Sequence, residues 1–424
     1  MVDTYYTQEA HGPFALHDIG SLELEEGGTI RNCKLAVATH GTLNAAKDNA
    51  VLVPTWYSGT SKIMEQAYIG PGRALDPSRY FIIVVNQIGN GLSTSPHNTP
   101  FPAGGAAFPR VRIGDDVRAQ HRLLTESLGL DSLALVVGGS MGAQQTYEWA
   151  VRYPDMVRRA APIAGTARNT VHDFLFAQTL VEAITADPAF ADGFYAAPGE
   201  VHRGLLRHAK LWAVMGWSTE FFQQRRPQAL GFSSLDDFIT NFMQAYFGPM
   251  DPNNLLCMAW KWQHADVSRH TQGDLKLALG RIRAKTFVMP ISHDMFFPPS
   301  DCLAEQQLIP GSEFLVQVEM KGLKLDPIRV KENDDYILGL QQEADAAIQE
   351  WAIKYTGHQI NIGSPQQLSD LLYSKMKLGP IGGSTDEDHL IKIQRRFDHP
   401  IVPLLMRWRK HAKARNTYVK SVYG

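Results

Sequence analysis

LALVVGGSMGAQQTYEWA, residues 133–150, places a serine between a predicted strand and a predicted helix. The stretch begins with apolar residues rich in valine, which are typical of a buried strand. After the glycines, apolar residues recur at helical spacing. The Gly-x-Ser-x-Gly pattern at 138–142 predicts a sharp, strained turn that exposes the hydroxyl of Ser140 as a nucleophile. Glycines next to serine also form ordinary loops, and the pattern alone leaves that alternative open.

Composition points to a globular protein with no broad affinity for nucleic acid or membranes. The 424 residues suffice for one large domain or two, with 44% hydrophobic and 20% charged residues and a formal net charge of -2. Cys33, Cys257 and Cys302 are widely spaced, so we expect buried thiols and no metal site. No signal peptide or membrane-spanning run is visible, and we expect a cytoplasmic protein without membrane contact.

Outside the serine stretch, short apolar runs alternate with helical patterns in the first part of the chain. This alternation predicts a mostly parallel sheet with helices on both faces. The opening residues differ because they alternate around a turn at 26–28, which predicts a hairpin. Strands or hairpins are predicted at residues 14–43, 50–53, 80–85, 133–137, 160–164, 284–289 and 313–318, and a helix at 113–128.

Residues 169–280 change to helical patterns rich in aromatic side chains, such as LLRHAKLWAVMGW. A helical insertion between strands predicts a cap over the functional site. Its tryptophans either line a substrate pocket or form the core of the cap.

Asp294 follows the predicted strand at 284–289, in the loop PISHDMFFPP. A carboxylate beyond the end of a strand, after the serine in sequence, fits the acid of a serine triad. The alternative is an aspartate that only forms a turn before a proline.

These motifs resemble the α/β-hydrolase fold, and within it the homoserine O-acetyltransferase-like family. The resemblance rests on ALVVGGSMGAQQTYEWAVRYPDMVRRAAPIAG, NNLLCMAWKWQHADVS and VMPISHDMFFPPSD, and covers roughly residues 10–316. It implies that Ser140 is the nucleophile, that Asp294 is the acid, and that the backbone amides of Tyr57 and Met141 form the oxyanion hole. The acetyltransferases have a histidine where this chain has Thr55, so the acyl group and acceptor stay open.

The triad histidine is missing from its expected place. A serine nucleophile needs a base, which in this fold follows the acid, but no histidine occurs from residue 295 to 357. His293 directly precedes Asp294, and its side-chain direction makes it a poor partner. His358 lies beyond a long predicted helix. The earlier histidines, expected to be structural or pocket residues, are His40, His97, His121 and His264.

The segment from about residue 318 to 424 resembles the thumb region of family A DNA polymerases, through TGHQINIGSPQQLSDLLYSKMKL and HPIVPLLMRWRKHAKARNTYVKSVYG. The residues themselves predict helices at 327–354 and 401–418, and helix caps at 364–365 and 384–386. The resemblance implies that Arg415, Asn416 and Thr417 contact a nucleic-acid backbone. The alternative is a solvated basic helix face. Palm and fingers motifs are absent, so we expect no polymerisation.

The sequence therefore predicts an α/β-hydrolase domain at 1–316, with a cap at about 169–280, fused near 313–319 to a helical segment at 317–424. We expect an ester hydrolase or O-acyltransferase that forms an acyl-serine and is impaired because its terminal histidine element is missing. The expected partner is a small ester or acyl donor, such as an acyl-CoA, with no metal or organic cofactor. Two alternatives stay open: a non-catalytic module that binds DNA weakly through the C-terminal helices, and an inactive hydrolase scaffold that serves as a binding protein.

Overall fold

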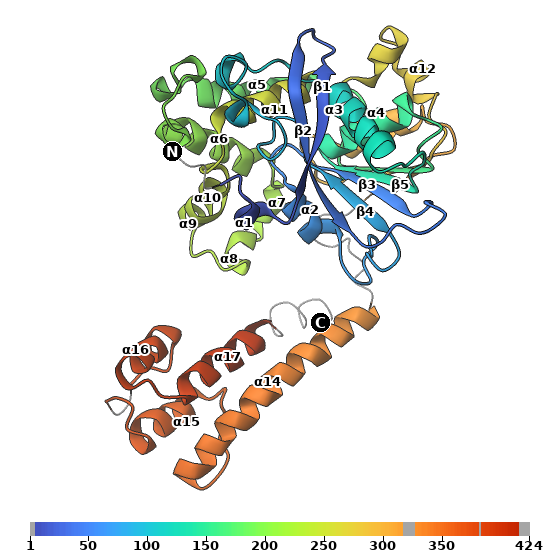
Figure 1. The fold of residues 1–424 in the computed structure, drawn as a ribbon. Coiled ribbons are helices and arrows are strands. Elements are labelled where there is room, and N and C mark those ends of the chain that lie inside the picture. Colours follow the sequence, from blue (N-terminus) through green and yellow to red (C-terminus); the bar gives the residue numbers. More distant parts are fainter. Residues whose placement is uncertain (1–4, 317–326, 381–382, 415–424) are drawn as a thin grey trace. The chain divides into compact units, whose positions relative to one another are not determined.

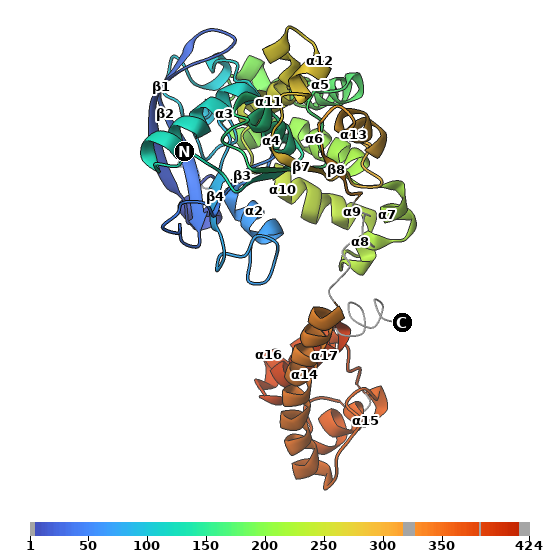
Figure 2. The ribbon, with the colours of Figure 1, turned by 90° about the vertical axis from the view of Figure 1, so that its right-hand side faces the viewer.

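The computed structural model describes residues 5–316, 327–380 and 383–414, which belong to two compact units, Met1–Gly322 and Leu323–Gly424. The first unit is built on an eight-stranded sheet in the order β1-β2-β4-β3-β5-β6-β7-β8 (Figure 1). The pairs β1–β2 and β2–β4 are antiparallel, and all later pairs are parallel. Figure 2 shows β7 and β8 at the far end of the sheet from β1 and β2. The strands are β1 (Ala15–Glu23), β2 (Thr29–His40), β3 (Ala50–Pro54), β4 (Phe81–Val85), β5 (Leu135–Gly139), β6 (Arg159–Ile163), β7 (Lys285–Val288) and β8 (Glu313–Phe314).

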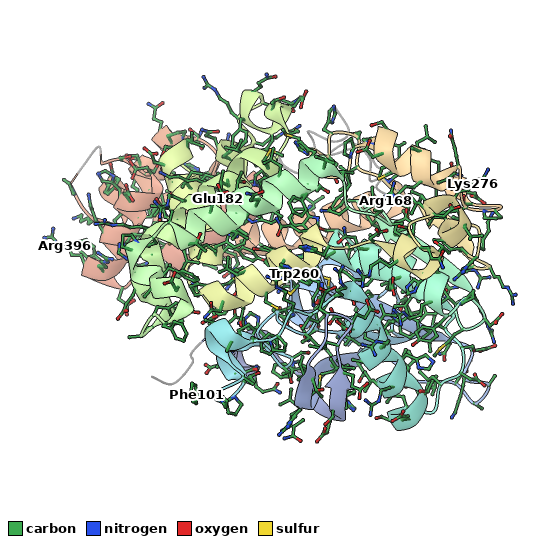
Figure 3. The ribbon with its side chains drawn as sticks, turned by 90° about the horizontal axis from the view of Figure 1, so that it is seen from above. Phe101, Arg168, Glu182, Trp260, Lys276 and Arg396 are labelled. Carbon is green, nitrogen blue, oxygen red and sulfur yellow. The ribbon has the colours of Figure 1, made fainter. Side chains whose placement is uncertain are left out.

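Helices fill the connections between the strands, and a larger group forms the cap after β6. Figure 3 looks down on this layer, where Glu182 marks α5 and Trp260 marks α11. The connecting helices are α2 (Ser61–Tyr68), α3 (Ile113–Arg122), α4 (Met141–Arg152) and α13 (Pro299–Gln306). The main cap helices are α5 (Val171–Thr185), α6 (His202–Met215), α10 (Ala245–Phe247) and α11 (Pro252–Gln263).

The two faces of the sheet bury different residues because successive side chains of a strand point in opposite directions. In β3, Val51 and Val53 belong to a core that includes Met64 of α2. Leu52 belongs to the opposite and larger core, which includes Trp149 of α4 and extends into the cap. Both faces are therefore covered near the centre of the sheet, as the alternating pattern predicts.

Towards β7, the face that carries Val51 is less well covered. Within the described residues, α2 is the helix that contributes to this core. The apolar side chains of Leu135, Ile163, Phe287 and Met289 lie on the same face and are only half-buried. Within the described residues, this face of the sheet is therefore covered less completely towards β7 than at its centre.

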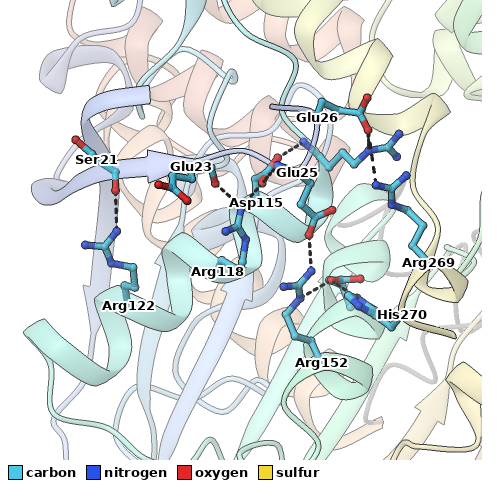
Figure 4. A network of polar contacts seen from close by, with 12 residues as sticks. Ser21, Glu23, Glu25, Glu26, Asp115, Arg118, Arg122, Arg152, Arg269 and His270 are labelled. Carbon is cyan, nitrogen blue, oxygen red and sulfur yellow. Dashed lines mark hydrogen bonds and ion pairs between the residues drawn. The ribbon is translucent and has the colours of Figure 1, made fainter. Parts of the chain in front are cut away.

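Ion pairs tie the opening hairpin to the helices of the larger core (Figure 4). Glu25, in the turn between β1 and β2, pairs with Arg152 near the end of α4, and its amide donates to Asp115 Oδ1 of α3 at 2.9 Å. Arg152 Nε and His270 Nε2 each lie 2.8 Å from Oε1 of Glu148. The C-terminal end of the helix that follows the serine is thereby held in place.

The second unit is all-helical, with α14 (Pro327–Thr356), α15 (Pro365–Ser369), α16 (Glu387–Phe397) and α17 (Ile401–Ala414). Ser364 caps α15 by accepting the amide of Gln367 at 3.4 Å, and Asp386 caps α16 by accepting the amide of His389 at 2.8 Å. Both helix starts agree with the sequence prediction. The core of the second unit includes Ile348, Ala352, Leu371, Leu390, Ile401 and Leu405. None of the helices in the described segments has the length and apolar character that a membrane span needs.

Candidate active site

Ser140 lies between β5 and α4 with φ 55° and ψ −123°, a backbone conformation that is strained for any residue with a side chain. The two glycines around it are required by close backbone approaches. A Cβ on Gly138 would lie 2.5 Å from the backbone of Gly142, and a Cβ on Gly142 would lie 2.6 Å from the carbonyl oxygen of Pro54. The structure thus favours the predicted elbow over an ordinary loop, and it directs Ser140 to the end of the sheet where the cap begins.

The loop after β3 places Tyr57 at the same pocket as Ser140. The Tyr57 side chain is only 2% exposed, and its hydroxyl donates to the carbonyl oxygen of Leu255 at 3.1 Å. Among the described residues, neither the amide of Tyr57 nor that of Met141 has a hydrogen-bond acceptor. Unpaired amides at this position are what an oxyanion hole requires. The roles of the two amides stay predictions.

Asp294 lies in the loop after β7 and lines the same pocket as Ser140. Its Oδ1 accepts the amides of Phe296 at 2.8 Å and Phe297 at 3.0 Å. These bonds form a turn, as the alternative interpretation of Asp294 as a turn-forming aspartate predicts. They also fix the carboxylate at the pocket, which is compatible with the predicted role as the triad acid.

The pocket has a volume of about 390 Å³ and is mainly aromatic. Apart from the polar groups of its tyrosines and tryptophans, its polar side chains are those of three serines, His293 and Asp294, and no lysine or arginine lines it in the described part of the chain. Such a pocket accommodates a small, uncharged ligand. The aromatic residues that line it are Trp56, Tyr57, Trp212, Trp217, Tyr246, Phe247, Phe296 and Phe297.

His293 is the histidine that lines the pocket, and its Nδ1 lies 3.1 Å from Oγ of its neighbour Ser292. No hydrogen bond between described residues joins a histidine to Ser140. The other candidates lie elsewhere: His97 contacts Asn254, His121 stacks on Tyr153, and His264 stacks on Trp260. His358 belongs to the second unit. The missing triad base therefore remains a prediction.

His208 of α6 is a buried residue beside the site that the sequence did not single out. Its Nε2 lies 3.1 Å from the hydroxyl of Tyr57, and its side chain is fully buried. Burial lowers the pKa of His208 to about 3, so the ring is neutral at ordinary pH. Its place inside a cap helix gives no sequence signal, because no spacing rule connects it with the distant loop that carries Tyr57.

Asp173 of α5 is a second residue that the sequence did not reveal. Its side chain is fully buried, and neither carboxylate oxygen has a hydrogen-bond partner among the described residues. Burial, followed by the charges of Asp294 and Asp301, raises the pKa of Asp173 to about 8. Its position in the first turn of a helix, after the capping residue Thr170, looks like ordinary capping chemistry in the sequence.

Comparison with known proteins agrees with this geometry. Residues 58–322 match the family described as alpha/beta hydrolase fold. The ethyl acetate hydrolase of Pseudomonas veronii is 68% identical over 313 residues, which cover 74% of this chain and 90% of that protein. The crystal structure of an acetylester hydrolase from Corynebacterium glutamicum is 60% identical and superposes with a TM-score of 0.74, covering 76% of this chain and 92% of that one.

The chain belongs to the alpha/beta-hydrolase family, and the predicted fold class is confirmed. The homoserine O-acetyltransferase of Thermobifida fusca is 32% identical over 329 residues, covering 70% of this chain and 85% of that protein. The acetyltransferases are thus relatives at low identity, as the resemblance implied, whereas the relatives at about twice that identity are named as hydrolases of acetyl esters.

The second unit has a separate match. Residues 334–423 match the family described as DNA polymerase family A. The predicted backbone contacts Arg415, Asn416 and Thr417 lie outside the described residues. In α17, Arg407 is exposed, and Arg409 donates to the carbonyl oxygen of Thr385.

Proposed function

We propose that the first unit is a serine ester hydrolase for small, uncharged esters, with the short acyl group carried on Ser140. The observation that supports this most is the strained elbow of Ser140, which shares one aromatic pocket with Asp294. Ser140 would attack the ester carbonyl, and the amides of Tyr57 and Met141 would stabilise the oxyanion.

The lining of the pocket favours hydrolysis over transfer to homoserine or from an acyl-CoA. Homoserine carries a carboxylate and coenzyme A carries phosphates, and both are usually bound by arginine or lysine. The described lining contains neither residue type. Water as the final acceptor needs no such group, and the closer relatives are named as ester hydrolases.

The sequence has no histidine from residue 295 to 357, where the triad base of this fold is expected, and this supports the further proposal that the hydrolase is impaired. Without a base the serine keeps its proton, and the leaving alcohol receives none. The half-buried face at Phe287 and Met289 is consistent with a hydrolase that lacks a terminal covering element.

The test is the turnover of p-nitrophenyl acetate by the full chain and by Ser140→Ala, with acetate measured as the product. Turnover above the Ser140→Ala background supports hydrolysis at this serine. Adding homoserine to the same assay separates the two reactions, because O-acetylhomoserine in place of acetate would overturn the choice of hydrolysis.

A second function rests on a different observation, the match of residues 334–423 to DNA polymerase family A. The second unit would bind duplex DNA weakly and without sequence preference, through phosphate contacts. A salt-dependent binding assay with a random-sequence duplex tests this proposal.

A further inference from the structure

A fully buried ion pair lies behind the loop that carries Tyr57. The ammonium group of Lys261, in α11, contacts Oδ2 of Asp116, in α3, and both side chains are 0–1% exposed. The same ammonium donates to the carbonyl oxygen of Ile88 at 2.6 Å and to Oε1 of Gln87 at 3.4 Å. All three N–H groups of Lys261 therefore have acceptors, as a buried charge requires.

Gln87 connects Lys261 with the loop after β3 through hydrogen bonds to Thr55. Its side-chain Nε2 donates to the carbonyl oxygen of Thr55 at 2.6 Å, and its backbone amide donates to Oγ1 of Thr55 at 3.2 Å. Lys261 can only donate hydrogen bonds, so only the oxygen end of the Gln87 side-chain amide can face it. That orientation leaves the nitrogen end facing Thr55.

The carbonyl of Thr55 also touches the nucleophile helix. Gln145 of α4 donates to it from Nε2 at 3.3 Å, and a Cβ on Gly142 would lie 3.3 Å from it. Thr55 is fully buried and stands two residues before Tyr57. A single carbonyl thus sets the spacing between the loop that supplies the Tyr57 amide and the helix whose first residue is Met141.

We propose that Lys261 and Asp116 are positioning residues for the oxyanion hole, acting through Gln87 on the carbonyl of Thr55. This inference rests on the proposed ester hydrolysis. Burying a lysine and an aspartate costs several kcal/mol of desolvation, and an apolar pair of similar size often packs as well. Lys261 of this pair donates to Gln87 and Ile88. An apolar pair cannot make these hydrogen bonds and so could not position the loop that contains Thr55.

The test uses three variants of the full chain. Lys261→Met with Asp116→Asn removes both charges together and leaves no unpaired ion. Gln87→Met keeps the ion pair but removes the bond to Thr55. Tyr195→Phe is the matched control, because it breaks the bond of the Tyr195 hydroxyl to Asp251 at 2.7 Å, in a polar cluster outside the pocket.

Two readouts are combined. For each readout, the test variants and the control are compared at equal loss of thermal stability. The first is hydrogen exchange of peptides that cover residues 52–60 and 85–90, measured by mass spectrometry without any substrate. We expect exchange at least ten-fold faster in both test variants and unchanged in the control. The second is p-nitrophenyl acetate turnover, where we expect kcat to fall 10- to 100-fold with KM within two-fold, less than the full loss of an oxyanion donor.

Unchanged exchange in folded test variants would overturn the proposal, and so would a kcat that falls no further than in Tyr195→Phe. If the unmodified chain shows no Ser140-dependent turnover, the proposed hydrolysis fails, and the exchange readout alone decides whether Lys261 and Gln87 position the loop.

Discussion

The hydroxyl of Tyr57 lies 3.1 Å from Nε2 of His208, and both side chains are buried between the sheet and the cap. The Tyr57 hydroxyl already donates to the carbonyl oxygen of Leu255, so its oxygen accepts a hydrogen bond from the Nε2–H group of the neutral His208 imidazole. The cap therefore holds the residue assigned to the oxyanion hole through a histidine that stays uncharged.

The first prediction is that protonation of His208 destabilises the fold in acid. Its pKa is about 3 when folded and near its ordinary 6.5 when unfolded, so the unfolded chain takes up the proton first. The free energy of unfolding should fall as pH drops below 6.5, by about 3 kcal/mol at pH 4.5. Urea unfolding of the chain and of His208→Gln at pH 7 and 4.5 measures this difference. Equal losses in both proteins would contradict the prediction.

The second prediction has the opposite sign and concerns Asp173. Its folded pKa of about 8 lies above the ordinary 3.8, so the folded protein holds a proton that the unfolded chain releases. Stability should fall as pH rises from about 4 to 8, by about 5 kcal/mol at most. Asp173→Asn should match the unmodified chain at pH 4 and be more stable at pH 8.5, whereas the exposed control Asp131→Asn should not differ at either pH. A gain for both variants at pH 8.5 would assign the effect to net charge and not to Asp173.

The third prediction is that a fluorophosphonate probe labels Ser140. The elbow places Ser140 in the lining of the pocket, together with Tyr57, whose amide is predicted to stabilise the oxyanion. Peptide mapping of the labelled chain identifies the site, with Ser140→Ala as the negative variant and Ser218→Ala, another serine of the pocket, as the control. Undiminished labelling of Ser140→Ala would show that a different serine reacts.

The fourth prediction is slow turnover, because no histidine occurs from residue 295 to 357, where the triad base is expected. Loss of the base lowers turnover on the order of 10⁶-fold in well-studied triads, and roughly 10³ to 10⁴ over water remains. Turnover of p-nitrophenyl acetate should therefore rise greatly when the tail from Val318 is replaced by a histidine-bearing hydrolase terminus. His293→Ala should leave the slow rate unchanged. Equal, Ser140-dependent rates for the original and replaced tails would mean that this chain already has a base.

The fifth prediction is that the second unit gives the chain a weak affinity for duplex DNA. Because phosphate contacts release counterions, the affinity should fall steeply between low and physiological salt. Fluorescence anisotropy with a labelled duplex measures it for the full chain and for a truncation that ends at Gln317. The same affinity in the truncation would assign any binding to the hydrolase unit.

The local pattern sufficed for the elbow of Ser140, because the strand, the turn and the helix are adjacent in sequence. It was less accurate at element ends. The predicted helix at 113–128 is α-helical only to Arg122 and continues as a π-helical turn, Leu123–Ser127, in which Leu123 and Leu124 are buried. The predicted last strand at 313–318 has two residues in β8; Leu315 and Val316 are not part of a strand, and residues 317–318 lie outside the described part.

The supporting residues of the site could not be predicted because their roles depend on partners far away in sequence. His208 is 151 residues from Tyr57, and Lys261 is 145 residues from Asp116. In sequence, Lys261 stands between two tryptophans and His208 stands between Arg207 and Ala209, and no spacing rule marks either residue as a buried polar contact. Their contacts are formed only in the folded structure, where the cap helices pack on the sheet.

The ion pair between Glu25 and Arg152 also bears on the order in which the chain folds during its synthesis. The two residues are 127 positions apart, so the opening hairpin leaves the ribosome long before the helix that clamps it exists. During that interval the hairpin has neither this ion pair nor its contacts with α3 and α4. The second unit follows only after residue 322, as a separate body. Since domains generally fold as units in the order of synthesis, the hydrolase unit completes its core while the polymerase-like helices are still being translated.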